Sequence, residues 1–280
     1  MPLFFNNYTK PGPGIPKNLP RKKGFALYFE LFIRHFWDFI KENMLFAIVS
    51  IPMFFILFYT TLFLDIFGIK EIVGESINSF SSFYAFALFI ICGSGPASAG
   101  MAYMMRCVTR EEHCFLWSDF WEKFKENFKQ SIVVSVIDIV LYILCFPAAV
   151  KFYYQMYQTS NSNIWYFFFV FTIVIAVIYA MMHMYFYQFI ITFELKLKDA
   201  MKNSFIMTVL YLPANIMLTI MVLAIIFLMS SYLNPVITAI IMLFFGSAFI
   251  RYPIEFFAAR AIEKRMLNNP VQETEDKEDE

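Results

Sequence analysis

Two ionisable side chains stand inside long apolar segments of the sequence, where a charge needs a partner. Asp138 follows the apolar run that starts at Ile132, and Arg251 lies near the end of the last apolar run. Both lie roughly 9–10 Å deep, at about 1.5 Å of helix rise per residue. Because an isolated charge is costly in hydrocarbon, equal depth and opposite sign predict an ion pair between them. Two alternatives stay open: Glu255 competes one helical turn from Arg251, or each charge reaches the interface separately.

A histidine and an asparagine form a second pair of matched depth. His183 and Asn215 lie equally far into their apolar segments, and polar side chains there usually hydrogen-bond between helices. A proton relay through His183 is the alternative, and it requires a carboxylate at the same depth. We expect no carboxylate there, which favours the hydrogen-bonding role.

A run of small residues interrupts the second apolar segment. It contains Gly93, Gly95, Pro96 and Gly100. Small side chains let helices approach closely, and a proline weakens the helix that contains it. We expect tight packing against a neighbouring helix. The alternative is a broken helix that lines a substrate or ion site, with the segment 244–248 as its nearest counterpart.

Patterns typical of catalysis or of cofactor binding are absent from the sequence. The run 93–95 lacks the Gly and Lys that complete a phosphate-binding loop, the three His lie in separate segments, and the four Cys form no CxxC pair. We therefore predict no catalytic, cofactor-binding or metal-binding residues, no cofactor, no enzymatic activity and no nucleic-acid partner.

Composition indicates what surrounds these residues. The chain has 280 residues, of which 60% are hydrophobic and only 16% charged. A soluble core needs less apolar bulk, so lipid must cover the excess. Segments of about 20 apolar residues cross a bilayer as helices, because lipid offers the backbone no hydrogen bonds. Six such segments lie near 44–64, 83–105, 132–150, 164–193, 204–229 and 235–258.

The distribution of positive charge predicts the orientation of these spans. With the N-terminus in the cytoplasm, all of the 22 Lys and Arg fall on the inner side except Lys70 and Lys151. We therefore predict a plasma-membrane protein with six spans and both termini cytoplasmic. Residues 1–43 form a cytoplasmic segment, residues 44–258 the membrane domain, and residues 259–280 a cytoplasmic tail whose acidic end is disordered.

Aromatic residues recur at helical spacing in two of the cytoplasmic segments, around 25–40 and 117–128. Such stripes predict amphipathic helices that lie at the lipid headgroups or pack on the protein's own spans. A polar lead that ends in Asn precedes three of the spans, at Asn43, Asn127 and Asn203. We interpret this as three copies of an elbow helix followed by a two-span hairpin, in an all-α membrane bundle.

Five motifs stand out along the chain, at 10–17, 34–37, 95–100, 115–121 and 124–131. Together they resemble the YesL-like family of membrane proteins from Gram-positive bacteria, and the resemblance extends from about residue 4 to about residue 265. Such proteins are often encoded beside carbohydrate ABC importers and their two-component regulators. No catalytic or binding residue is established for the family, so the resemblance assigns none here.

The resemblance implies an accessory or regulatory role in carbohydrate ABC import, with transporter subunits or a sensor kinase as partners besides the lipid bilayer. A small-solute transporter or channel is the alternative, because of the break at Pro96. A membrane enzyme acting on lipid-linked substrates would need a polar cluster at the interface. Such a cluster would draw on Glu30, Arg34, Arg106 and Glu111.

Overall fold

The computed structural model describes residues 24–52, 59, 64–69, 72, 77–91, 95–193 and 195–267, and these contain helices and no strands. Gly93, the N-terminal motif 10–17 and the acidic end of the tail lie outside the described residues. The helices, three of them π-helices (η), are α1 Phe25–Arg34, α2 Phe36–Val49, α6 Ile77–Ile91, α7 Pro96–Arg110, α8 Leu116–Glu126, α9 Phe128–Ile139, η2 Val140–Cys145, α10 Phe146–Ser160, α11 Asn163–Phe193, α12 Leu197–Leu210, α13 Leu212–Tyr232, α14 Pro235–Ile241, η3 Met242–Gly246, α15 Ser247–Ile262 and η4 Glu263–Leu267.

Three elbows of nearly the same backbone conformation separate short helices from the helices that follow them. His35 (φ −103°, ψ 17°) separates α1 from α2, Asn127 (φ −95°, ψ 6°) separates α8 from α9, and Tyr211 (φ −107°, ψ 26°) separates α12 from α13. Asn127 therefore lies at an elbow, as its motif predicted. Asn43 and Asn203 do not, because they lie inside α2 and α12.

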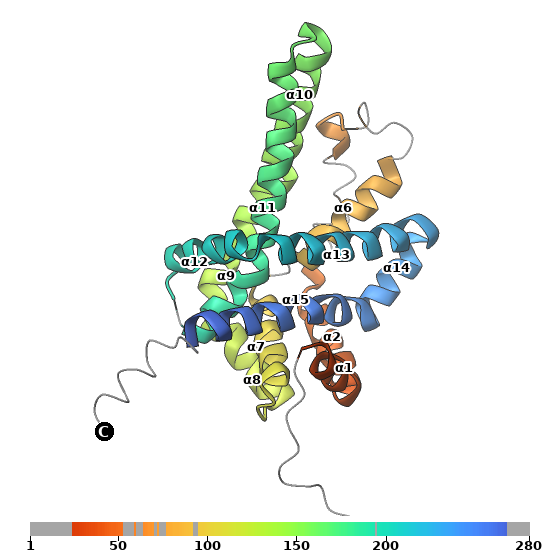
Figure 1. Cartoon of the computed structure of the whole chain (residues 1–280). Coiled ribbons are helices and arrows are strands. Elements are labelled where there is room, and N and C mark those ends of the chain that lie inside the picture. Colours follow the sequence, from red (N-terminus) through yellow and green to blue (C-terminus); the bar gives the residue numbers. More distant parts are fainter. Residues whose placement is uncertain are drawn as a thin grey trace, which may run out of the picture.

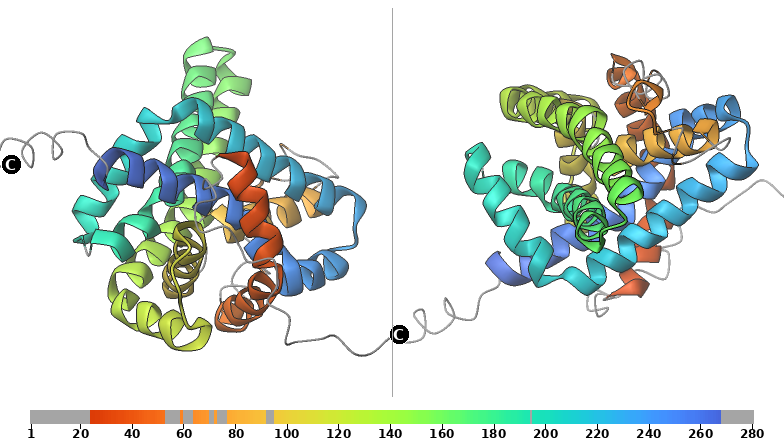
Figure 2. Two further views of the ribbon diagram at one scale, coloured as in Figure 1. Left: turned by 60° about the horizontal axis from the view of Figure 1, so that its bottom comes forward. Right: turned by 90° about the horizontal axis from the view of Figure 1, so that it is seen from above.

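The long helices run in two directions. α10 and α11 lie side by side as an arm, and α13 and α15 run across the direction of this arm (Figure 1). The two further views show the same crossing (Figure 2). α1 and α8 lie at the end of the molecule opposite the tip of the arm. Among the described helices the long ones therefore cross one another, and the arrangement as three hairpins stays a prediction.

Within the described residues, three helical stretches are long and apolar enough to cross a membrane. They are Phe128–Ser160 with 33 residues, Asn163–Phe193 with 31 and Leu212–Tyr232 with 21. In the described part of the chain, the second predicted span is divided between α6 and α7, and the last is interrupted by η3. The count of six spans stays a prediction.

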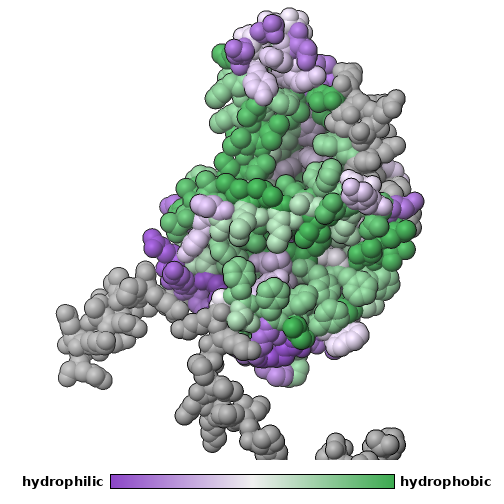
Figure 3. Space-filling model, turned by 45° about the vertical axis from the view of Figure 1, so that its right-hand side comes forward, coloured by the Kyte–Doolittle hydropathy of each residue, from purple (hydrophilic) through white to green (hydrophobic). Residues whose placement is uncertain are grey.

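The surface places an apolar belt between two polar ends. Figure 3 shows hydrophilic residues at the tip of the arm and at the opposite end, with hydrophobic side chains between them. Large hydrophobic side chains that are exposed include Phe152, Phe167, Phe171, Ile220 and Phe227. Soluble monomers rarely expose so continuous an apolar surface. The chain is therefore a helical membrane protein.

Candidate functional site

Five buried polar side chains meet where α2, α7, α11 and α15 pack together. We name Glu42, Ser98, Gln188, Arg251 and Glu255 the central polar cluster. None of them is more than 3% exposed. Charged side chains are almost never buried this completely unless they are paired, so their contacts decide what the cluster can do.

The contacts of the cluster centre on one guanidinium. Arg251 donates from Nη1 to Ser98 Oγ (3.0 Å) and from Nη2 to Glu255 Oε1 (3.2 Å). Gln188 Nε2 donates to Glu255 Oε2 (2.8 Å) and to the backbone oxygen of Ala102 (3.1 Å). Both carboxylate oxygens of Glu255 are therefore satisfied, in a geometry that compensates much of the cost of burying this ion pair.

The predicted ion pair between Asp138 and Arg251 is wrong. Arg251 takes the competing partner Glu255, because residues four apart on α15 face the same side of the helix. Asp138 faces α11 instead, where it accepts a hydrogen bond from the Tyr179 hydroxyl at 2.8 Å. Equal depth did not bring these two charges together, since each found a partner on its own or on an adjacent helix.

Asp138 also meets His183, a contact that sequence reasoning missed. His183 Nε2 lies 3.0 Å from Asp138 Oδ1, and both side chains are buried. The expectation that no carboxylate reaches the depth of His183 is wrong, because α9 begins at Phe128 and not near residue 132. Asp138 therefore lies ten residues from the start of α9, and His183 ten residues from the end of α11.

Asn215 forms a hydrogen bond between two helices. Its Oδ1 accepts a hydrogen bond from the Tyr185 hydroxyl at 2.7 Å, and its Nδ2 donates to the backbone oxygen of Thr208 at 3.1 Å. The depth match with His183 therefore indicates no direct bond, although Asn215 does link α11 to α13.

Asn43 hydrogen-bonds to backbone groups at an irregular turn of another helix. Its Nδ2 donates to the oxygen of Met242 (3.1 Å), and its Oδ1 accepts from the N–H of Ala248 (2.7 Å). These groups flank the π-helical turn η3, where the regular ladder is disturbed. The side-chain amide thus satisfies one donor and one acceptor and joins α2 to α15.

The small-residue run is a packing site where the structure describes it. Gly95 (φ 63°) precedes α7, and a Cβ there would lie 2.5 Å from Ser135 Oγ of α9. A Cβ on Gly100 would lie 2.8 Å from the Phe120 ring of α8. Pro96 occupies the first turn of α7, where a missing N–H costs nothing. Close approach to α8 and α9 explains these small residues, as the packing interpretation predicted.

The amphipathic helix at 25–40 packs on the protein's own helices, and its position at the lipid headgroups stays a prediction. Phe32, Phe39 and Tyr252 lie in an aromatic cluster that holds the elbow at His35 against α15. The opposite side is exposed, and we name its large side chains the elbow surface: Phe25, Phe29 and Trp37 from α1 and α2, with Phe115 and Trp117 from the start of α8.

Charged contacts tie the two parts of the elbow surface together. Arg34 Nη1 of α1 donates to Glu111 Oε2 at 3.0 Å, and Arg34 also pairs with Glu30. Glu111 follows the end of α7, in the segment that leads to α8. The hydrogen bond to Glu111 is the main cause that raises the pKa of Arg34 above its usual value. Arg106 stays outside this group and donates to Thr192 Oγ1 at 2.9 Å. The cluster considered for an enzyme therefore forms only in part.

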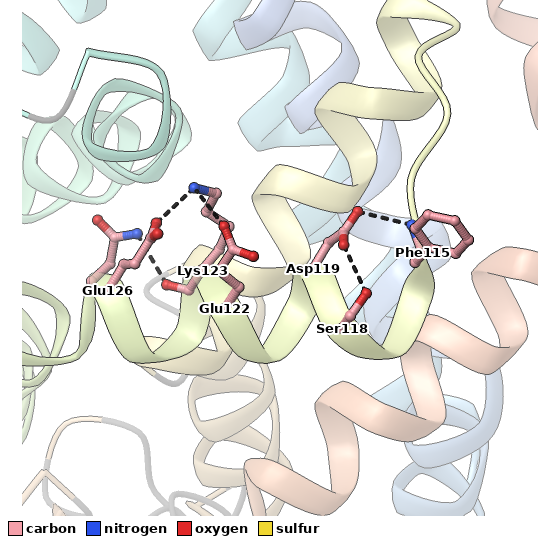
Figure 4. A network of polar contacts seen from close by, with 7 residues as sticks. Phe115, Ser118, Asp119, Glu122, Lys123 and Glu126 are labelled. Carbon is pink, nitrogen blue, oxygen red and sulfur yellow. Dashed lines mark hydrogen bonds and ion pairs between the residues drawn. The ribbon is translucent and has the colours of Figure 1, made fainter.

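The helix α8 carries its own polar contacts. Figure 4 shows Asp119 beside the backbone nitrogen of Phe115, and Lys123 between Glu122 and Glu126. The bond from Phe115 N–H to Asp119 Oδ2 measures 2.8 Å and satisfies a donor at the start of the helix. At the other end, Asn127 Nδ2 donates to the oxygen of Lys123 at 3.0 Å, which stabilises the elbow.

One cavity among the described residues is apolar. It has a volume of about 430 Å³ and lies between α6, the η2 and α10 region, α11 and α13. Its walls include Phe83, Tyr142, Phe169, Ala176 and Leu223. Neither the small-residue run nor the central polar cluster lines this cavity.

Comparison with known proteins gives a match for one part of the chain. No curated protein sequence and no solved structure matches the chain. Residues 45–147, which contain α6 to α9, match the family model described as "Protein of unknown function, DUF624".

Proposed function

We propose that this protein is an accessory or regulatory component of carbohydrate ABC import in the plasma membrane. It has six spans with both termini cytoplasmic, and it acts by binding transporter subunits or a sensor kinase. The resemblance to the YesL-like family motivates the partner, and the match over residues 45–147 is to a family of unknown function. The observation that carries the mode of action is the elbow surface, where aromatic side chains stay exposed beside the Arg34–Glu111 ion pair.

The character of the cavity supports binding over transport of the sugar itself. A sugar needs hydrogen-bond partners for its hydroxyl groups, because burying them without partners is costly. The 430 Å³ cavity is lined almost wholly by apolar side chains. In the central polar cluster, Arg251, Ser98 and Glu255 already bind one another.

Co-purification tests this proposal. The tagged protein is extracted from its native membrane in a mild detergent, and the proteins that accompany it are identified by mass spectrometry. We expect subunits of a carbohydrate ABC importer or a sensor kinase. Replacing Trp37 and Trp117 by Ala should remove them, whereas Phe167→Ala and Phe171→Ala on the arm should not. If no such component exceeds the level in an untagged strain, the proposal is wrong.

Single-cysteine labelling tests the orientation separately. In a background without the native cysteines, Ser118→Cys on α8 should react with a membrane-impermeant maleimide only after the cells are opened. Ser160→Cys at the tip of the arm should react in intact cells. The reverse pattern would contradict the predicted topology without bearing on the identity of the partner.

A small-solute transporter or channel is the second candidate, and the buried charges of the central polar cluster favour it, since such residues often mark ion paths in membranes. Uptake of labelled sugars into proteoliposomes that contain only this protein distinguishes the two candidates. Uptake above that of protein-free liposomes would support transport. Uptake equal to theirs, together with co-purification of an importer, would support the accessory role.

A further inference from the structure

Glu42 is the unbalanced member of the central polar cluster. It is 2% exposed, and its Oε1 has no hydrogen-bond partner among the described residues. The groups that act on it electrostatically are Glu255 and Arg251 of α15, Cys107 of α7 and Asp38 on its own helix. Glu255, the other carboxylate of the cluster, has a partner for each of its two oxygens.

The charges of the cluster do not cancel if both carboxyl groups are ionised. Glu42 and Glu255 would carry two negative charges against the single guanidinium of Arg251. That guanidinium already binds Glu255 and Ser98. Asp38 repels an ionised Glu42, and its own carboxylate pairs with His35 and Lys41 instead. A buried ion without a counter-charge is strongly disfavoured, because its desolvation is not repaid by an opposite charge.

The cluster also lacks a hydrogen-bond donor. Gln188 uses its Nε2 for two acceptors, Glu255 and the Ala102 oxygen, which fixes the orientation of its amide. Its Oε1 is left without a donor, although Gln188 is only 1% exposed. The cluster thus holds two buried acceptor oxygens, on Glu42 and on Gln188, that have no partner.

A proton would remove the excess negative charge and supply the missing hydrogen-bond donor, and a metal ion would not. A proton on a carboxyl oxygen removes one negative charge and adds one O–H donor. A metal cation would lie beside the positive charge of Arg251. We therefore propose that the central polar cluster is a proton-binding site, in which Glu42 carries the proton and Arg251 stays paired with Glu255.

A small cavity gives this proton a way in. A void of about 10 Å³, close to the volume that one water needs, is lined by Gln188 together with Arg106, Arg110, Thr192 and Glu263. Arg110 and Glu263 are partly open to solvent, with 29% and 26% of their side chains exposed. Gln188 therefore belongs to the central polar cluster and also lines a void whose other walls reach partly exposed residues.

Loss of the proton would change which helices the guanidinium joins. An ionised Glu42 competes with Glu255 for Arg251, and a shift of Arg251 toward Glu42 replaces a bond within α15 by a bond between α15 and α2. The proton thus controls a contact between two helices that also meet through Asn43. This inference holds whether the protein acts as an accessory component or as a transporter.

Infrared spectroscopy of the purified full-length protein tests the site. At neutral pH the wild type should show the C=O stretching band of a protonated carboxylic acid, and Glu42→Gln should lack it. The matched control is Glu126→Gln on α8, an exposed residue paired with Lys123, which should keep the band. Absence of the band in the wild type, or its persistence in Glu42→Gln, would overturn the proposal.

Thermal unfolding in detergent supplies a second readout. The unfolded chain releases this proton above about pH 4, the ordinary range of a glutamate. The folded state still holds it at neutral pH, so the wild type loses stability as the pH rises from that value. Glutamine mimics the protonated carboxyl, so Glu42→Gln should lack this component of the pH dependence. Its Tm should match that of the wild type near about pH 4 and exceed it by a growing margin as the pH rises. A Glu42→Gln protein that fails to fold, or whose Tm falls with pH as steeply as that of the wild type, would contradict a proton on Glu42.

Discussion

The two halves of α11 are both rich in apolar residues, although the second contains His183 and Gln188, and they have opposite environments. Between Asn163 and Tyr179 no residue is buried, whereas between Ala180 and Ile191 every residue except Met182 is buried. The first half lies beside α10 in the arm, and the second half packs against α7, α12 and α15. An apolar helix therefore indicates that water is excluded, but it does not say whether lipid or protein excludes it.

Truncating one phenylalanine in each half gives the largest expected contrast. Phe189→Ala removes a fully buried ring, and Phe171→Ala removes one that is 48% exposed. We expect the first to lower the free energy of unfolding by about 3–5 kcal/mol, and the second to change it by no more than about 0.5 kcal/mol. Denaturant unfolding in detergent micelles measures both. Equal losses would contradict the division of α11.

Two arginines extend the comparison to charge. Arg251→Gln leaves the buried Glu255 without its counter-ion, and we expect a loss of about 3–5 kcal/mol. Arg34→Gln breaks a pair whose side chains are 46% and 32% exposed, and such pairs contribute about 0–1 kcal/mol. The same unfolding assay applies. An Arg251→Gln protein as stable as Arg34→Gln would show that the cluster does not need its guanidinium.

Two asparagines that looked alike in the sequence should differ in how much their replacement lowers stability. Asn43→Ala strands the N–H of Ala248 and the oxygen of Met242, at about 1–3 kcal/mol for each buried group. Asn203 lies partly exposed inside α12, so Asn203→Ala should have little effect. Thermal unfolding of the two variants side by side decides this. A larger loss for Asn203→Ala would restore the equivalence that the repeat suggested.

The smallest effect concerns the packing of α7 on α8. In Gly100→Ala the new methyl group would press on the Phe120 ring, and overpacking of this kind costs about 1–3 kcal/mol. Adding Phe120→Leu should recover part of the loss, because it frees space at the same contact. A double-mutant cycle measures that coupling, and strictly additive losses would mean that the two residues do not touch.

Sequence reasoning reached the local features of the candidate site but few of its contacts between helices. The pairing of Arg251 with Glu255 was one of the considered alternatives, because a spacing of four residues fixes proximity on one helix. The elbow at Asn127 was visible because a stripe of aromatic residues leads into it. The contact of Asp138 with His183 was missed, since its depth was counted from a helix start four residues too late. The role of Asn43 had no signal, because the π-helical turn it serves lies about two hundred residues away in the chain.

The sequence by itself determined that this chain is a helical membrane protein. Its apolar segments are so long and continuous that they would be unstable in contact with water. It also determined the elbow helices, whose aromatic spacing follows the period of one helix. Only the tertiary structure decided which apolar faces meet lipid, which charges share a buried cluster, and where a carboxyl group is left without a counter-ion. Those outcomes depend on how helices far apart in the chain cross, and hydropathy carries no information about crossing.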